Sequence, residues 1–163
     1  MAGFGSAPTL VKVFFILLIV GILFHIVGFA TPYWSDDDYY SHNGLWRSCY
    51  YRHVYHGQQC FKTNFSASWF EATQAFQVIG LVAAFIGLIL VILFIFVTQT
   101  SNNRTVYIIG MVAVLVAAGC TILSIIIFGS KVSALSWSFA LAVIGGILYG
   151  VAGLLMLINM LKR

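Results

Sequence analysis

Residues 76–97 read FQVIGLVAAFIGLILVILFIFV, and none of these 22 residues carries a charge. A helix rises about 1.5 Å per residue, so a segment of this length crosses the roughly 30 Å hydrocarbon core of a bilayer. Three more segments of 22 or 23 residues are also free of charge, at residues 13–34, 106–128 and 137–158. A charged side chain at a helix centre would cost about 2.5–3.5 kcal/mol on insertion. The sequence therefore predicts four membrane-spanning helices.

The overall composition is that of a membrane protein. Apolar residues make up 61% of the 163-residue chain and charged residues only 7%, whereas a soluble domain carries about 25% charged residues. Because so few polar side chains cannot cover a globular surface, a soluble enzyme and a disordered regulator are excluded. The net charge of +4 comes from eight basic residues with no basic run, which excludes a nucleic-acid-binding module.

The connections between the four segments are unequal in length. The first, loop 1 at residues 35–75, has 41 residues, whereas residues 98–105 and loop 2 at residues 129–136 have eight each. Short connections make neighbouring helices antiparallel, so we expect one domain, residues 1–163, built as an up-down four-helix bundle. The alternative for the first segment is a cleaved signal peptide, although its apolar run exceeds the usual length of about 7–15 residues.

The cysteines indicate which side of the membrane loop 1 faces. The basic residues divide evenly between the two sides, so the positive-inside rule gives no orientation. Cys49 and Cys60 lie in loop 1 with ten residues between them, which favours a disulfide formed in an oxidising compartment. A reduced pair or half of a metal site is the alternative. We therefore place loop 1 outside the cell, both termini in the cytoplasm and the protein in the plasma membrane.

Two Asn-x-Ser/Thr sequons lie on successive loops, so at most one of them faces a glycosylating compartment. Asn64 shares loop 1 with the cysteines and is the candidate glycosylation site. Asn103 lies three residues from an apolar segment, too near the bilayer for easy enzyme access.

Small residues four positions apart mark three of the apolar segments, among them the pairs Gly80 and Ala84, and Gly146 and Gly150. Such spacing lets helices approach closely, either inside the bundle or at a lateral dimer contact. His25 is the ionisable group near the middle of a span, where we expect a buried imidazole bonded to a neighbouring helix. A pH-sensing role for this histidine is the alternative.

No catalytic residue, metal site or cofactor is expected. The chain lacks the Cys-x-x-Cys pair of a membrane thiol oxidoreductase. The acidic run Asp36–Asp38 lacks the spaced oxygen ligands and glycine of a calcium loop, so it is expected to be a solvated acidic patch. The lipid bilayer is an expected partner of such a sequence.

Directly after the first apolar segment comes an ordered set of residue types, namely Trp34, Gly44, Leu45, Trp46, Cys49 and Cys60. This order, within four spans, resembles the claudin and peripheral-myelin-protein superfamily. The stretches WFEATQAF at residues 69–76 and SWSF at residues 136–139 look like the claudin-like branch that contains lens fibre membrane intrinsic protein.

The resemblance implies the fold class: an all-α membrane protein whose left-handed up-down bundle is topped by a small extracellular antiparallel β-sheet from loop 1. A disulfide would join two of its strands, and loop 2 could add a short strand. Trp34 and Trp46 are expected to be interfacial anchors, with the apolar ring buried and the N–H in water.

The resemblance also implies a non-enzymatic protein of cell–cell contacts, acting in adhesion or as a paracellular barrier. We expect a homo-oligomer, in cis and in trans, with a larger membrane-protein partner as an option. The candidate recognition residues are the acidic and aromatic residues of the loop, Asp36, Asp37, Asp38, Tyr39, Tyr40, Tyr50, Tyr51 and Tyr55. The alternatives are an auxiliary subunit of a channel or receptor and an ion-selective paracellular channel.

Overall fold

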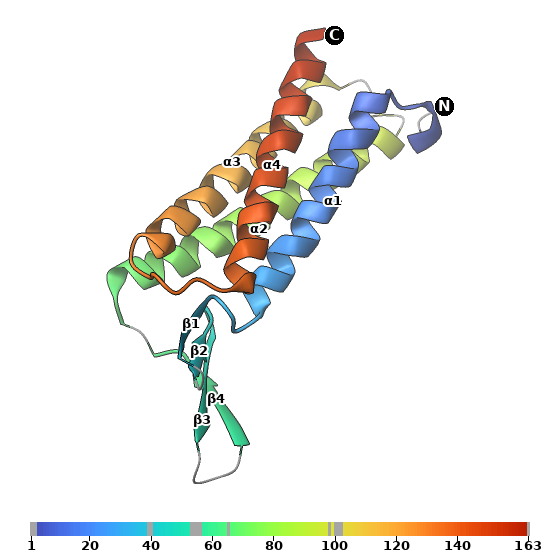
Figure 1. The fold of residues 1–163 in the computed structure, drawn as a ribbon. Coiled ribbons are helices and arrows are strands. Elements are labelled where there is room, and N and C mark those ends of the chain that lie inside the picture. Colours follow the sequence, from blue (N-terminus) through green and yellow to red (C-terminus); the bar gives the residue numbers. More distant parts are fainter. Residues whose placement is uncertain are drawn as a thin grey trace.

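Four long helices and four short strands follow one another along the chain (Figure 1). The computed structural model describes residues 3–38, 41–52, 57–64, 66–97, 99 and 103–162, with the side chains of residues 37 and 38 outside that description. A short 3-10 helix, Phe4–Ser6, precedes the helices α1 (Thr9–Ala30), α2 (Ser68–Phe96), α3 (Arg104–Gly129) and α4 (Trp137–Lys162). Between α1 and α2 lie the strands β1 (Ser35–Asp38), β2 (Ser41–Asn43), β3 (Arg47–Arg52) and β4 (Gly57–Lys62).

All four helices are long and apolar enough to cross a membrane. Most of their ends differ by a few residues from the charge-free segments, and two of the differences have a clear local cause. The first helix ends at Ala30 instead of residue 34 because Pro32 disfavours a helical conformation for Thr31, which is extended. The second begins at Ser68, eight residues before residue 76, because its first turn contains the charged residue Glu71 and so falls outside a charge-free segment. A carboxylate is favourable at that positive end of a helix, but it interrupts a charge-free segment.

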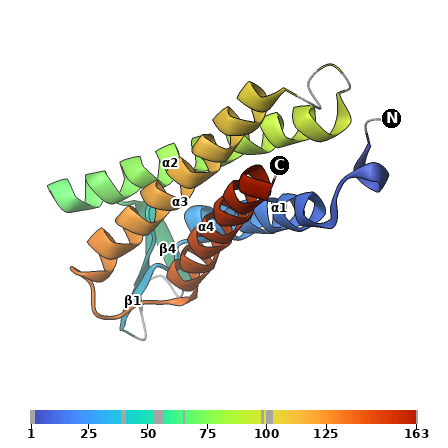
Figure 2. The ribbon, with the colours of Figure 1, turned by 90° about the horizontal axis from the view of Figure 1, so that it is seen from above.

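The helices associate as two pairs, α1 with α4 and α2 with α3, and contacts between α3 and α4 join the pairs (Figure 2). Large apolar side chains such as Leu23, Ile89, Ile126 and Leu154 point outward, as lipid-facing residues do. Buried side chains from every helix form the core, including Phe14, Ala84, Val114, Tyr149 and Met156.

The small residues singled out in the sequence have different surroundings. Ala84 is fully buried. A Cβ built on Gly80 would lie 2.7 Å from Thr121 Oγ1, and one on Gly146 would lie 3.2 Å from Thr121 Cγ2, so both glycines face α3 at close approach. A Cβ on Gly150 would meet nothing within 4 Å among the described residues, so this glycine is open to the outside of the bundle.

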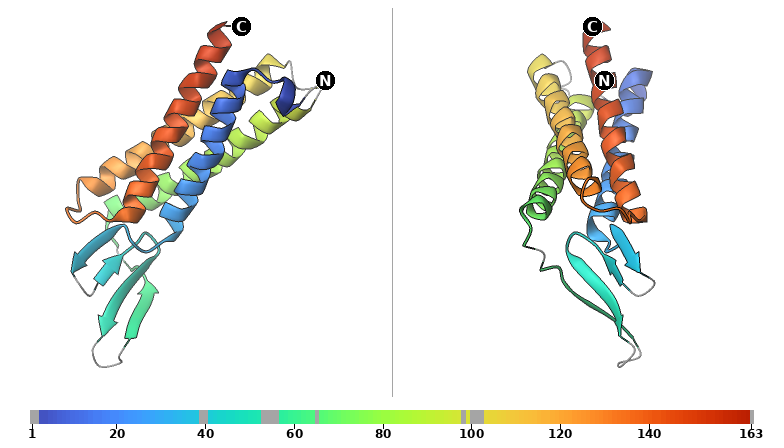
Figure 3. Two further views of the ribbon diagram at one scale, coloured as in Figure 1. Left: turned by 45° about the vertical axis from the view of Figure 1, so that its right-hand side comes forward. Right: turned by 60° about the vertical axis from the view of Figure 1, so that its left-hand side comes forward.

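The four strands form one open antiparallel sheet in the order β1-β2-β3-β4, at the end of the bundle away from both termini (Figure 3). The register places Asp36 opposite His42, His42 opposite Cys49, and Cys49 opposite Cys60. Loop 2 reaches the outer edge of β1 through a single bridge between Ser35 and Leu135, so its contribution is a bridge and not a strand. A four-helix bundle with a small antiparallel sheet confirms the predicted fold class.

Candidate functional site

Trp34 joins the helices to the sheet from a fully buried position. Its indole N–H donates a 2.7 Å hydrogen bond to the carbonyl oxygen of Gly28, in the last turn of α1. That carbonyl has no partner within the helix, because the last four carbonyls of a helix lack intrahelical donors. The Trp34 ring meets Phe128 and Phe139 edge to face, with ring centroids 5.0 and 5.6 Å away. The prediction that this N–H would face water was therefore wrong.

The backbone of Trp34 makes two further connections. Its N–H donates to the carbonyl of Asn43 at the end of β2, over 2.9 Å, and its carbonyl accepts from the N–H of Ser136 in loop 2, over 3.0 Å. Next to it, Ser138 N–H on α4 donates to the carbonyl of Tyr33 over 3.1 Å. One residue thus ties together the end of α1, the sheet and the chain entering α4.

Gly44, Leu45 and Trp46 have three separate roles. A Cβ on Gly44 would lie 2.4 Å from Pro32 Cα, so only glycine fits where the two backbones cross. Leu45 is fully buried beside Trp34, and its carbonyl accepts a 2.5 Å hydrogen bond from the Gln74 side chain on α2. Trp46 is 37% exposed, and its role as an interfacial anchor stays a prediction.

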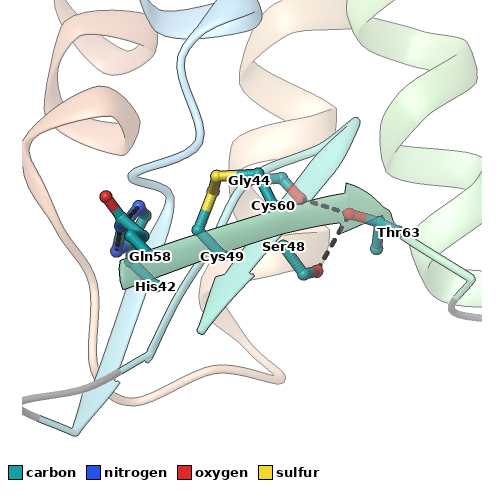
Figure 4. Close-up of a disulfide and its surroundings, with 7 residues drawn as sticks. All are labelled: His42, Gly44, Ser48, Cys49, Gln58, Cys60 and Thr63. Atoms are coloured by element: carbon teal, nitrogen blue, oxygen red, sulfur yellow. Dashed lines mark hydrogen bonds between the residues drawn. A yellow bond between two sulfur atoms is a disulfide. The ribbon is translucent and has the colours of Figure 1, made fainter. Parts of the chain in front are cut away.

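Cys49 and Cys60 form a disulfide across neighbouring strands, β3 and β4, where the register already places them opposite each other (Figure 4). Nearby, the hydroxyls of Ser48 and Thr63 hydrogen-bond over 3.0 Å. Across β3, the Gln58 amide of β4 lies 3.0 Å from Nε2 of His42 on β2. The hairpin is thus fixed by the disulfide and the Ser48–Thr63 bond, and the Gln58–His42 contact ties it to β2.

The exposed aromatic side chains of the sheet lie on this hairpin. Tyr50 and Tyr51 of β3 are 47% and 43% exposed, and Phe61 of β4 is 55% exposed. Asp36 is exposed on β1, and Asp37 and Asp38 continue that strand. Tyr39, Tyr40 and Tyr55 lie outside the described residues.

A groove lies between the sheet and the helix ends; we call it the basal groove. It is a cavity of about 540 Å³ bounded by Tyr50, Phe61 and Lys62 of the hairpin, by Trp69 of α2 and by Lys131 of loop 2. A second cavity of about 420 Å³ adjoins it on the hairpin, where Tyr50 and Phe61 line both cavities and Arg52 and Gln59 complete the second. The two form a continuous surface that is aromatic and cationic.

Asn64 is exposed and lines the basal groove between β4 and α2. The other sequon asparagine, Asn103, caps α3, where its side chain accepts a 3.0 Å hydrogen bond from the N–H of Thr105. Both sequon asparagines are exposed, so exposure does not distinguish them, and glycosylation of Asn64 stays a prediction.

Polar side chains also join the helices inside the bundle. His25 is fully buried, and its Nδ1 hydrogen-bonds with the Tyr149 hydroxyl of α4 over 3.2 Å. This confirms the expected buried imidazole bonded to a neighbouring helix. The Gln77 amide of α2 donates to the Ser124 hydroxyl of α3. These contacts link α1 with α4 and α2 with α3, the same pairs that pack most closely.

Several residues of the site were not singled out in the sequence. Phe128 and Phe139 surround Trp34, and Lys62, Lys131 and Phe61 line the basal groove. In the sequence, nothing distinguished the three phenylalanines from phenylalanines that face lipid. The short stretch SWSF at residues 136–139 was the one available signal, since it contains Phe139.

Comparison with known proteins matches residues 8–156 to the model of the PMP-22/EMP/MP20/Claudin family. The lens fiber membrane intrinsic proteins of Rattus norvegicus and Mus musculus are each 31% identical to the chain over 88 residues, which is 52% of this chain and 47% of theirs. The Homo sapiens protein is 30% identical over 74 residues, 44% of this chain and 39% of its own. The chain spans about half the length of the curated relatives it matches.

Proposed function

Because the chain belongs to the PMP-22/EMP/MP20/Claudin family, a family of structural multi-pass membrane proteins, we propose that it acts without catalysis at cell–cell contacts. In this proposal the sheet faces the extracellular space and mediates adhesion or barrier formation through self-association. The observation that supports it is the exposed aromatic surface of the β3–β4 hairpin, held by a disulfide and tied to the helices through Trp34.

Binding through the aromatic side chains of the hairpin costs little conformational entropy. Tyrosine and phenylalanine provide a large contact area with only two side-chain torsions, so little conformational freedom is lost on binding. The disulfide and the buried Trp34 limit the motion of the strands before any contact forms. Exposed aromatic rings are unfavourable in water and become favourable when a second protein covers them, so a rigid surface of this kind suits recognition between proteins.

The orientation is part of the proposal. The disulfide between Cys49 and Cys60 requires an oxidising compartment, so in this proposal the sheet lies outside the cell. Both termini are at the opposite end of the bundle (Figure 3) and therefore lie in the cytoplasm, with the protein in the plasma membrane. Asn64 is then exposed to the glycosylation machinery. Loss of a glycan from the Asn64→Gln variant, read as a gel shift that glycosidase treatment of the wild type reproduces, tests this orientation.

Cell aggregation tests the adhesion proposal. We expect the wild-type chain to aggregate non-adherent cells that express it, and the variant Tyr50→Ser, Tyr51→Ser, Phe61→Ser to leave them dispersed at equal surface level. The matched control is Phe96→Ser, since Phe96 is 48% exposed at the other end of α2. Dispersed wild-type cells, with junctional resistance unchanged, would contradict the proposal.

A second candidate, an auxiliary subunit of a channel or receptor, is favoured by one observation. Gly150 of the Gly146-x-x-x-Gly150 spacing is open to the outside of the bundle, where a helix of another membrane protein could approach closely. Cross-linking in native membranes distinguishes the two functions. Copies of this chain in the product support self-association, whereas a larger membrane protein in one-to-one ratio supports the auxiliary role.

A further inference from the structure

Aromatic rings line the basal groove on the hairpin and on the helices. On the hairpin, Tyr50 and Phe61 are 47% and 55% exposed. On the helices, Trp69 meets the rings of Phe70 and Phe128 edge to face, with ring centroids 5.7 and 6.1 Å away, so its position is fixed. Rings of this kind offer a large apolar face to a ligand and lose little conformational freedom when they bind it.

Uncharged polar groups complete the lining of the groove. The hydroxyls of Ser48 and Thr63 bond to each other over 3.0 Å (Figure 4). A hydroxyl has one donor hydrogen and two acceptor lone pairs, so this pair can still accept hydrogen bonds from a ligand. The other uncharged polar residues of the lining are Ser35, Asn43, Asn64 and Ser133. Aromatic rings beside hydroxyl and amide groups suit a neutral ligand that has both hydroxyls and an apolar face, which is the chemistry of a pyranose sugar.

A candidate attachment point for a sugar lies within the lining itself. Asn64 is exposed, lines the groove and begins the sequon Asn64-Phe65-Ser66. It follows the end of β4 by two residues and precedes the start of α2 by four. A sugar on its side chain therefore starts between the hairpin and α2. The groove volume of about 540 Å³ lies within the range of about 300–1,000 Å³ that is usual for small-molecule sites.

We propose that the basal groove binds the first N-acetylglucosamine of a glycan attached to Asn64. This inference rests on the proposed orientation of the sheet and names the ligand of the groove. On attachment, Asn64 Nδ2 forms a bond to the anomeric carbon of the sugar and loses one proton, while the bond from that carbon to the diphosphate of a lipid-linked oligosaccharide breaks. The apolar C–H face of the sugar packs on the rings of Phe61 and Trp69, and its hydroxyls bond to the polar groups of the lining.

The bound sugar covers one face of the hairpin. Neighbouring residues of a strand point to opposite faces, and Tyr50 lines the groove whereas Tyr51 does not. The Tyr51 side chain, which is 43% exposed, therefore remains accessible to a partner protein. Because the sugar contacts both β4 and α2, it also makes the connection between the sheet and the bundle more rigid.

Stepwise removal of the glycan tests this site in the full chain purified in detergent. An endoglycosidase leaves one N-acetylglucosamine on Asn64, whereas the variants Asn64→Gln and Ser66→Ala carry no sugar. We expect the trimmed protein to melt together with the fully glycosylated one and both variants to melt roughly 2–4 °C lower. Labelling of the half-buried Cys120 by a thiol reagent during heating measures melting. Equal melting of trimmed and sugar-free protein would overturn the proposal.

A pair of hairpin variants shows whether the stabilisation comes from the groove. In Phe61→Ser, which removes an exposed ring of the lining, we expect the forms with and without the sugar to melt together. The matched control is Tyr51→Ser, which removes an exposed ring outside the lining and should keep the full difference. The same difference in both variants would place the sugar elsewhere.

Nuclear magnetic resonance gives a direct readout of position. With an isotope-labelled N-acetylglucosamine on Asn64, we expect its proton signals to shift upfield through the ring currents of Phe61 and Trp69 and to show nuclear Overhauser contacts with these rings. Signals at the positions of the free sugar, without such contacts, contradict the proposal.

A relocated sequon separates this inference from the proposed function. The variant Asn64→Gln, His53→Asn, Tyr55→Thr places the sequence Asn-Val-Thr between β3 and β4. If this variant is glycosylated and Asn64 of the wild type is not, or if the sugar on Asn64 adds no stability, the orientation stands and the groove site is wrong. If neither chain is glycosylated, the proposed orientation and the groove site fail together.

Discussion

Replacing Trp34 by Phe tests the link between the sheet and the helices. The change removes the indole N–H that donates to the Gly28 carbonyl and leaves that buried oxygen without a partner, at a cost of about 1–3 kcal/mol. The smaller ring also leaves unfilled space between Phe128 and Phe139, which adds about 1 kcal/mol. We expect Trp34→Phe to lower the free energy of unfolding by about 2–4 kcal/mol, or roughly 30-fold to 700-fold in the equilibrium constant.

The assay uses the free cysteine of the chain. Two of the three cysteines form the disulfide, and Cys120 on α3 is half-buried, so a thiol-reactive fluorophore reports opening of the bundle as purified protein is heated in detergent. The matched control is Trp46→Phe, because Trp46 is already 37% exposed and its loss should cost below about 1 kcal/mol. Equal melting of the two variants would refute the structural role assigned to the buried indole.

Three further substitutions test close approach and covalent fixation. Gly44→Ala should destabilise the protein by about 1–3 kcal/mol, since its Cβ would lie 2.4 Å from a backbone atom; the same thiol assay measures it. Gly28→Ala should likewise lower the melting temperature, because its Cβ would lie 2.7 Å from a carbonyl oxygen, whereas Gly150→Ala, whose Cβ would meet no described residue within 4 Å, should not. Equal melting of these two would contradict the helix contacts. Replacing Cys49 and Cys60 by Ser should destabilise the sheet by roughly 3 kcal/mol, seen as faster proteolysis of residues 35–64 while helical circular dichroism is unchanged.

The helices could be predicted because the free-energy cost of placing a charged side chain in the bilayer depends only on the residues of the segment itself. A charge-free stretch needs no information from the rest of the chain, and each of the four helices overlaps its predicted segment. The helix ends differ from the predicted limits where a single residue, such as a proline or a carboxylate, determines where the helix ends or the charge-free segment begins. Pro32 ends α1 early, and α2 begins before the charge-free stretch because Glu71 lies in its first turn.

The site depended on contacts between distant segments, and there the sequence was less informative. Tryptophan near a span end suggests the membrane interface, and the partial exposure of Trp46 is compatible with that position. For Trp34 the deciding partners are the Gly28 carbonyl and the rings of Phe128 and Phe139, which only the folded bundle brings together. The basal groove likewise joins the hairpin, α2 and loop 2, so no single stretch of sequence contains its pattern.

The two neighbouring buried residues Trp34 and Leu45 have a mechanical consequence for the whole bundle. Trp34 is bonded to Gly28 of the α1–α4 pair, and the neighbouring Leu45 is bonded through its carbonyl to Gln74 of the α2–α3 pair. The sheet therefore acts as a clamp that spans both helix pairs at one end. The two pairs cannot splay apart there without breaking these bonds, so separation has to start at the end that carries the termini, and a pull on the hairpin is distributed over both pairs instead of bending one helix.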